Sequence, residues 1–255
     1  MTALYIDSLA ATVRTRPRFQ PSGGLPHNHL RRQVADLVAR RRGVPLERMT
    51  VRQPADNDIA DAGDFLIIQR ALAALGPQEE DQTLYLVRSG PLLDPLLAPL
   101  AATAHSLGWR GDALGVSHLE EQAATLLFGL LAWAVPQDAG ATVVIVDDPA
   151  YVDPLTESPA YAAVSMRLCR EGPLRVHAWG EGLPQGADSR AYTHKFHGAR
   201  ACDAWLALHA ALSSGAIGRG QTALLHTASE EREGWVLVEA IEPDHVRLAG
   251  SRIEG

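Results

Sequence analysis

The sequence has little cysteine, no excess of positive charge and no long hydrophobic run. Its 255 residues include two cysteines, Cys169 and Cys202, which excludes a disulfide framework and indicates a reducing compartment. The formal net charge of -7 argues against a general nucleic-acid binder, because neutralising phosphates requires a basic face. No stretch approaches the roughly 20 apolar residues of a membrane span, and the N-terminus lacks a signal-like pattern. We therefore expect a cytoplasmic chain with no nucleic-acid and no membrane partner.

What is present is the composition of a globular protein. Hydrophobic residues make up 46% of the chain and charged residues 21%, which is enough apolar material for a sizeable core. The pattern of predicted elements changes after Pro154. We expect a single domain over residues 1–255, with an N-terminal half at 1–155 and an abbreviated C-terminal half at 156–255.

The N-terminal half alternates predicted strands and helices. The continuous Val/Ile run in 140–150 is typical of a strand that is buried on both faces, and glycines at 43 and 76 are expected to end two of the helices. This alternation is typical of a layered α/β sheet. The predicted strands are 3–13, 82–90, 113–117 and 140–150, and the helices lie within 27–43, 55–74, 100–109 and 118–134.

The C-terminal half begins with two predicted strands, 161–170 and 173–182, which we expect to be consecutive and antiparallel. A helix follows within 198–218 and stops at Gly215. Residues 221–241 are then predicted to form a strand, an acidic turn and a strand. The last residues, "GSRIEG", are compatible with native chain or with a cloning remnant, and they are assigned no element.

The segment "ALGVSHLEEQAATLLFGLLAWA" (113–134) predicts a short strand, a tight polar turn and a long apolar helix. Many enzymes present a nucleophile at such a helix N-terminus. The turn contains His118, Glu120 and Glu121 but no cysteine. The segment is therefore either an active site with unusual chemistry or one that has lost its chemistry.

Four blocks in the same order resemble the ketosynthase III branch of the thiolase-like condensing enzymes. They are "DFLIIQRALAALG…DQTLYLVRSGP", "LGVSHLEEQAATLLFGLLAWA", "ATVVIVDDPA" and "KFHGARACDAWLALHAALSSGAIGRGQTALLHTASEEREGWVLVEA". The resemblance covers most of the chain at low identity, and the last block is the most specific. It implies a thiolase-like layered α/β fold with a shortened C-terminal half.

The chain departs from that family at its catalytic positions. Glu120 stands where the family has its cysteine, and His197 corresponds to the catalytic asparagine. A thiolate at a helix N-terminus attacks thioesters, whereas a carboxylate with a reference pKa of about 4.3 is a weak nucleophile. The catalytic histidine has no segment to occupy, and "SEERE" (229–233) replaces the glycine-rich turn, so its carboxylates would oppose an oxyanion.

The resemblance also implies a partner, because family members are obligate dimers in which a loop of one protomer closes the other's acyl pocket. Residues 89–99 correspond to that loop, so Leu92, Leu93 and Leu96 are candidates to reach a partner's acyl pocket or, alternatively, to pack within their own chain. The basic cluster "RRQVADLVARRRG" (31–43), with Arg31 and Arg41, is either a solvated helix face or a docking site for an acyl carrier protein.

We hypothesise a catalytically inactive ketosynthase-like subunit that pairs with an active ketosynthase III-like enzyme, with no cofactor and no metal. The alternatives are a malonyl-thioester decarboxylase and an acyltransferase or hydrolase that uses Ser117 as its nucleophile. His194 and His197 lie at helical spacing, which leaves a metal site as a further alternative. The buried apolar contexts of His177, His209 and His226 favour core or boundary histidines instead.

Overall fold

The computed structural model describes residues 3–14, 19–52, 65–77, 81–90, 99–117, 119–135, 139–147, 149–155, 161–182, 192–228 and 232–253. Within that part of the chain, the helices are α1 (Leu30–Arg41), α2 (Phe65–Ala74), α3 (Pro99–Ser106), α4 (Ala123–Ala134) and α5 (Asp203–Ser213). Gly43, Gly76 and Gly215 follow α1, α2 and α5 with φ angles of 65°, 81° and 68°. These left-handed glycines confirm the predicted helix ends.

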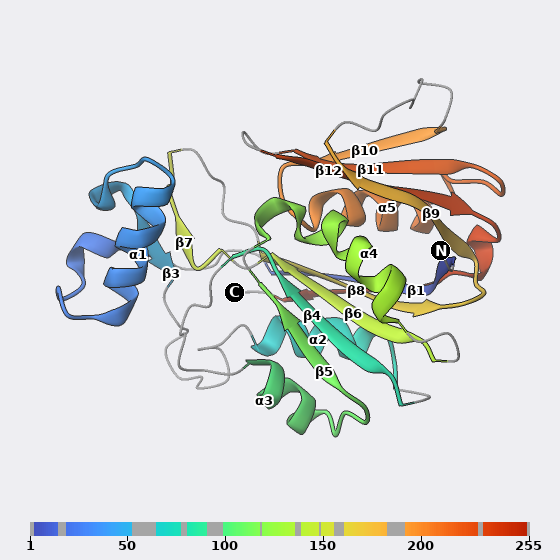
Figure 1. The fold of residues 1–255 in the computed structure, drawn as a ribbon, viewed down its shortest axis with the longest axis horizontal. Coiled ribbons are helices and arrows are strands. Elements are labelled where there is room, and N and C mark those ends of the chain that lie inside the picture. The colour runs from blue at the N-terminus through green and yellow to red at the C-terminus, as the bar shows by residue number, and fades with distance from the viewer. Residues whose placement is uncertain are drawn as a thin grey trace.

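A mixed sheet of ten strands forms the main body (Figure 1). Its strand order is β10-β11-β12-β9-β1-β8-β6-β4-β5, and β13 pairs with β1 beside this path. The bounds of these strands are β1 (Leu4–Arg14), β4 (Thr83–Arg88), β5 (Ala113–Val116), β6 (Ala141–Asp147), β8 (Tyr161–Cys169), β9 (Leu174–Glu181), β10 (His194–Gly198), β11 (Thr222–Ala228), β12 (Glu233–Ala240) and β13 (Arg247–Ile253).

The strands β8 and β9 form as predicted, but their expected pairing with each other is wrong. Both run antiparallel to β1, which lies between them. The 11 residues of β1 are long enough to pair with β8 along one side and with two strands along the other. On that second side β9 pairs with Leu4–Ile6 and β13 with Ser8–Arg14.

The strand β13 includes C-terminal residues to which the sequence assigned no element. Residues 250–253 of "GSRIEG" continue β13, where Gly250 to Ile253 pair in parallel with Ala11 to Arg14 of β1. The sequence of this segment alternates poorly between apolar and polar residues, so its strand is specified by the partner β1 rather than by its own pattern. The chain is therefore part of the fold to at least residue 253.

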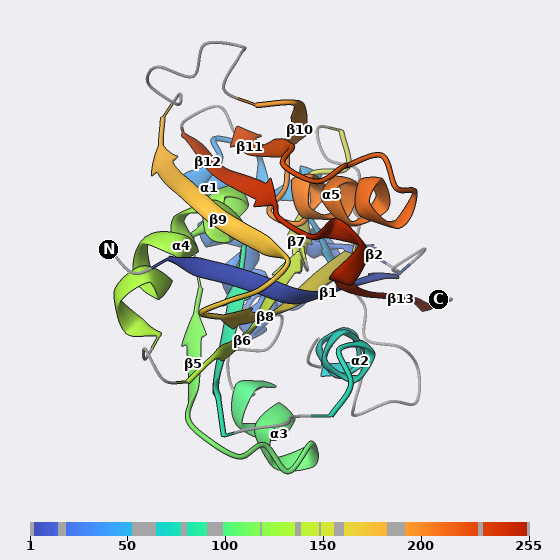
Figure 2. The same ribbon diagram turned by 90° about the vertical axis from the view of Figure 1, so that its right-hand side faces the viewer.

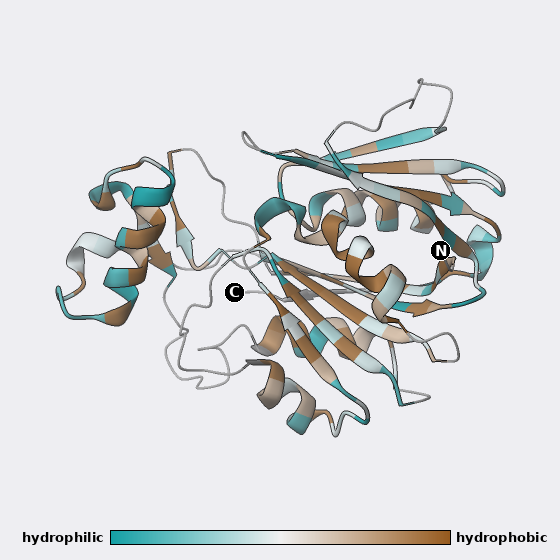
Figure 3. Cartoon of the chain, viewed as in Figure 1, coloured by the Kyte–Doolittle hydropathy of each residue, from teal (hydrophilic) through white to brown (hydrophobic). Residues whose placement is uncertain are grey.

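The helices form layers on the two faces of the β4–β6–β8–β1 region (Figure 2). Alternate residues of β4 and β6 pack against the helices on the two faces, because successive side chains of a strand point to opposite faces. Leu84, Leu86 and Val144 pack with α2, whereas Tyr85 and Val143 belong to the core of α4 and α5. The strand β6 is therefore buried on both faces, which confirms the prediction from its continuous Val/Ile run. The apolar strands are brown in Figure 3.

The helices α4 and α5 share a central layer between the N-terminal strands and β9–β12. Phe128 of α4 stacks on Trp205 of α5 with ring centroids 5.5 Å apart. The indole nitrogen of Trp205 donates to the carbonyl oxygen of Ala124 at 3.3 Å. Both aromatic side chains are fully buried, so the contact joins the two halves at the centre of the core.

A small lobe lies beside the main body, on the left of Figure 1. It contains α1 and a second sheet with the order β2-β3-β7, and the sequence analysis did not predict this sheet. Its strands are β2 (Phe19–Pro21), β3 (Thr50–Arg52) and β7 (Tyr151–Val152). Two or three residues per strand are too few to display a hydrophobic period. No helix within the described ranges is long and apolar enough to cross a membrane.

Candidate functional site

The start of α4 is the position at which the sequence predicts a degenerate active site. A 3-10 turn, Glu120–Gln122, leads from the end of β5 into α4. Glu120 has a φ of 53° and is the non-glycine residue with positive φ in the part of the chain that the structure describes. This conformation costs an L-residue about 1–2 kcal/mol, and such strained residues cluster at functional sites. His118 lies outside the described residues.

The side chain of Glu120 forms an ion pair with α1. Its Oε1 atom lies 2.7 Å from Nη2 of Arg41, and the two side chains are 40% and 63% exposed. The structure therefore brings together two residues that the sequence analysis had assigned to different roles, the cysteine position and carrier docking. Arg31 is half-buried, and its backbone N–H donates to Nδ1 of His29 at the start of α1 at 3.2 Å.

The strand β12 packs closely against the start of α4. A Cβ atom added at Gly234 would lie 2.2 Å from Oγ1 of Thr125 and 3.3 Å from Cγ of Gln122. Gly198 of β10 has a similar restriction, since its Cβ would lie 2.8 Å from Cβ of Asp203. These two glycines permit the close approach of sheet and helices. Neither glycine was singled out from the sequence, although a glycine inside a strand pattern is a known indicator of close approach.

His197 lies on β10, the strand that precedes α5. It pairs in register with His226 of β11, and the two Nδ1 atoms are 3.2 Å apart. Nε2 of His226 lies 3.4 Å from Oε2 of Glu233. The prediction that His226 is buried is confirmed, since its residue exposure is 6%. Burial is the main cause that lowers the pKa of His226, and a hydrogen bond with Glu233 opposes it.

These three side chains lie on the face of the sheet that points away from α4 and α5. In β12 the buried residues Gly234, Val236 and Val238 face the helices, so Glu233 and Trp235 face the opposite side. His226 pairs with Trp235 and therefore shares that side. Two expectations are thereby corrected: Glu233 is directed away from the start of α4, and so is His197. The other residues of the acidic turn, 229–231, lie outside the described residues.

The expected helical spacing of His194 and His197 is also wrong, because both lie on a strand. Three residues apart on a strand, they point to opposite faces. Nε2 of His194 lies 2.9 Å from Oε1 of Gln221. The two histidines therefore do not share a metal site.

The start of α5 is buried and contains a cysteine. The backbone N–H of Cys202 donates to Oδ2 of Asp147 at 2.7 Å. Burial raises the pKa of Asp147, and it raises the pKa of Cys202 well above its ordinary value with a further contribution from the Asp147 charge. Burial likewise raises the pKa of Cys169 to about 11. Neither thiol is a good nucleophile at neutral pH, since the thiolate is the reactive form.

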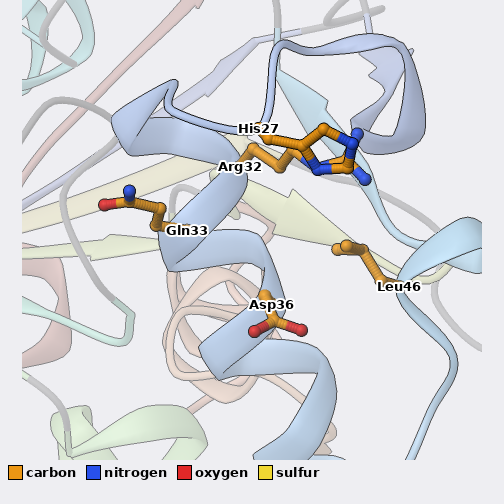
Figure 4. A pocket seen from close by; sticks show the side chains of 5 residues that line it. All are labelled: His27, Arg32, Gln33, Asp36 and Leu46. Carbon is orange, nitrogen blue, oxygen red and sulfur yellow. The ribbon is translucent and has the colours of Figure 1, made fainter.

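A shallow hollow of about 240 Å³ lies in the small lobe between α1 and the turn before β3 (Figure 4). Arg32 at its wall donates to the carbonyl oxygens of Gly23 and Leu25, both at 2.8 Å. These contacts hold the lobe together and give the arginine a structural role. The hollow is lined by His27, Arg32, Gln33, Asp36 and Leu46.

The predicted acyl-pocket residues Leu92, Leu93 and Leu96 lie outside the described residues. Ser117 is exposed at the end of β5. The structure thus joins Glu120 with Arg41 and separates both of them from His197.

Comparisons with known proteins identify the fold. No protein-family model matches the chain, and no curated protein matches its sequence. Among solved structures it is similar to the acyltransferase ChlB3, with a TM-score of 0.62 and 14% identity over 95% of this chain and 99% of that one. It is also similar to 3-oxoacyl-(acyl carrier protein) synthase III, FabH, from Pseudomonas aeruginosa PAO1, with a TM-score of 0.57 and 15% identity over 94% and 99%.

A third similar structure is PksG, an HMG-CoA synthase from Bacillus subtilis, with a TM-score of 0.61 and 10% identity over 96% of this chain and 81% of that one. All three belong to the thiolase-like condensing and acyltransferase enzymes. The chain has a thiolase-like fold. The predicted fold class is confirmed, and at these identities the comparison concerns the fold alone.

Proposed function

We propose that this chain is a catalytically inactive ketosynthase-like subunit. It pairs with an active ketosynthase III-like enzyme in acyl or polyketide biosynthesis, stabilises that enzyme and shapes its acyl pocket. The thiolase-like fold of condensing enzymes supports the pathway class. The residue at the start of α4 supports the loss of chemistry.

The observation that carries the proposal is the conformation and pairing of Glu120. Its φ of 53° keeps a strained backbone at the beginning of the buried helix, in the place where the family resemblance puts a nucleophile. The side chain is a carboxylate in contact with the guanidinium of Arg41. A carboxylate is already a weak nucleophile toward a thioester, and pairing its charge with a cation lowers its reactivity further.

Catalysis at Glu120 would also need a group that moves protons. His197 is the residue that the resemblance assigns to the second catalytic position, and its side chain lies on the far face of the sheet with His226. The two buried or half-buried thiols have raised pKa values. These facts favour an inactive site over a rearranged one.

Exposed apolar groups support the existence of a partner. The edge strand β5 exposes 51% of Leu114, and α4 exposes 76% of Trp133. An open sheet edge with exposed apolar side chains is a surface that other chains can cover. Docking of a carrier protein at Arg31 and Arg41 remains part of the proposal, although Glu120 neutralises one of these two charges.

The experiment has two arms. The purified chain is first assayed for turnover of malonyl- and acyl-thioesters, together with Glu120→Gln, which removes the charge at nearly constant size. The chain is then co-expressed with a cysteine-containing ketosynthase encoded nearby. We expect no turnover by the chain alone and a stable one-to-one complex.

Turnover that Glu120→Gln abolishes would refute the proposal and favour the alternative, a malonyl-thioester decarboxylase or an acyltransferase. Failure to co-purify would refute the partner role. An Arg31→Glu, Arg41→Glu variant tests carrier docking separately, and we expect it to weaken carrier binding without disrupting the complex.

A further inference from the structure

The pair of histidines on the outer face of the C-terminal strands is outside the proposed active site. His197 and His226 are directly opposite each other on the neighbouring parallel strands β10 and β11. Their Nδ1 atoms are 3.2 Å apart, their ring centroids 5.2 Å, and their ring planes are inclined by 47°. The face that they share is opposite to the face that packs on α4 and α5, so the pair is independent of Glu120.

The separation of the two nitrogens matches the spacing that a small divalent metal imposes on its ligands. With metal–nitrogen distances of about 2.0–2.1 Å and tetrahedral angles, two ligand nitrogens lie about 3.3–3.4 Å apart. The observed 3.2 Å is close to this value. Without a metal, the same distance is bridged by one proton, which one imidazole donates to the other.

The second nitrogen of His226 has the partner that metal-binding histidines usually have. Nε2 lies 3.4 Å from Oε2 of Glu233, so the carboxylate favours a proton on Nε2 and leaves the lone pair on Nδ1, the nitrogen nearer His197. Such a carboxylate fixes the tautomer and increases the basicity of the ligand nitrogen. A neutral imidazole is the form that binds metals.

We propose that His197 and His226 bind a divalent transition metal ion of the zinc class through their Nδ1 atoms, with Glu233 as the carboxylate behind His226. No cluster of three or more histidine, cysteine, aspartate or glutamate ligands occurs among the described residues. The described residues therefore supply two ligands, and water or an external ligand completes the coordination. The exposed ring of His197 gives the ion direct access from solvent.

The charges around the pair predict how its affinity responds to substitution. Glu233 favours a cation, whereas Lys195 lies two residues before His197 on the same face of β10 and opposes it. The pair of Arg232 with Glu181 at 3.4 Å contributes one charge of each sign nearby. The bound ion would fasten the edge strand β10, which directly precedes α5, to β11.

The test is a calorimetric titration of the full-length chain, without a polyhistidine tag, with Zn²⁺ alone. We expect one ion per chain, and His197→Ala weakens binding at least about tenfold because it removes a ligand. His194→Ala is the matched control: it removes a histidine three positions away on the opposite face of the same strand, and we expect unchanged affinity. Circular dichroism confirms that both variants fold.

Two further variants probe the surroundings of the ion. Glu233→Gln should weaken Zn²⁺ binding by about 10- to 100-fold, the usual effect of removing such a carboxylate. Lys195→Gln should strengthen it about two- to fivefold by removing an exposed like charge. The proposal is overturned if the wild type shows no saturable binding up to about 0.1 mM Zn²⁺, or if His194→Ala loses as much affinity as His197→Ala.

Discussion

Both halves of the molecule contain a strand, a central helix and a second strand that pairs with an antiparallel strand, but the start of the central helix differs between them. In the N-terminal half, β5 leads through α4 to β6, which pairs with the antiparallel β8 at the beginning of the C-terminal half. In the C-terminal half, β10 leads through α5 to β11, and the antiparallel β12 follows. The path β5-β4-β6-β8-β1 has five strands, and the described path β10-β11-β12-β9 has four. The shortening relative to the family remains a prediction.

Each central helix begins against strands of the other half. The start of α4 lies against Gly234 of β12, and the start of α5 is capped by Asp147 of β6. The start of α5 is buried and its backbone donor is bonded within the core. The start of α4 is half-exposed, strained at Glu120 and paired with Arg41 of the small lobe. One helix start is therefore structural, whereas the other retains the exposure and strain of a functional position.

The largest expected effect is on the contact that joins the halves. Trp205→Ala removes a fully buried side chain that stacks on Phe128 and bonds to the carbonyl oxygen of Ala124. We expect it to lower the free energy of unfolding by about 3–5 kcal/mol, measured by urea denaturation. Trp133→Ala on α4 is the control. Because Trp133 is 76% exposed, it should change stability by less than about 0.5 kcal/mol. Similar losses for both tryptophans would contradict the shared core.

The next effect concerns the close approach of β12 to α4. Gly234→Ala places a methyl group 2.2 Å from Oγ1 of Thr125, and we expect a loss of about 1–3 kcal/mol from overpacking. Adding Thr125→Ala should recover part of the loss, because it removes the nearest atom. Gly23→Ala has no heavy atom within 4 Å of the new Cβ and is the control. A neutral Gly234→Ala would mean that the start of α4 does not lie against β12 in solution.

A third substitution tests the buried helix start. Asp147→Ala leaves the backbone N–H of Cys202 without the acceptor that it has at 2.7 Å. An unsatisfied buried donor costs about 1–3 kcal/mol, so the alanine variant should be less stable than Asp147→Asn by that amount. The asparagine keeps an acceptor oxygen at nearly the same position. Equal stability of the two variants in denaturant titrations would show that this cap is dispensable.

Asp147 also predicts how the free energy of unfolding depends on pH. Burial raises the pKa of Asp147 above its ordinary 3.8, so the folded state disfavours the charged form. The stability that the protonated carboxyl contributes is present below the ordinary pKa and is lost as pH rises through the raised pKa. Wild type should therefore lose stability relative to Asp147→Asn as pH rises above about 4, measured as the difference in unfolding free energy. The opposite slope would mean that Asp147 is stabilised in its charged form.

Much of the fold was predictable because it depends on long apolar patterns. The seven buried residues of β6 and the apolar α4 and α5 have strong periods or continuous runs, and such segments are specified locally. The position of β1 between β8 and β9 is not local: it depends on pairing between residues that are far apart in the sequence, from Arg14 with Tyr161 to Leu4 with Val176. The three-residue strands β2 and β3 of the small lobe are too short to carry a pattern.

The candidate site was predictable in part for the same reason. The turn that contains Glu120 was found from its place between a strand and an apolar helix, and the family resemblance singled out Glu120 within it. The left-handed backbone of Glu120 agrees with a special role at that position. Its pairing with Arg41 depends on the placement of the small lobe, which no local pattern specifies. His197 was placed at helical spacing from His194, because "HKFHG" has neither branched residues nor alternation strong enough to indicate a strand. Its partner His226 could be found only through the β10–β11 register.

The smallest expected effect separates strain from charge at the start of α4. Glu120→Ala and Glu120→Gly both remove the ion pair with Arg41, and an ion pair between such exposed side chains contributes about 0–1 kcal/mol. Only glycine also relieves the positive φ of 53°. Urea denaturation should therefore find the glycine variant more stable than the alanine variant by about 1 kcal/mol, after allowance for the greater chain entropy of unfolded glycine. If alanine is the more stable of the two, Glu120 is not held in a left-handed conformation in solution, and the difference between the two helix starts reduces to their exposure.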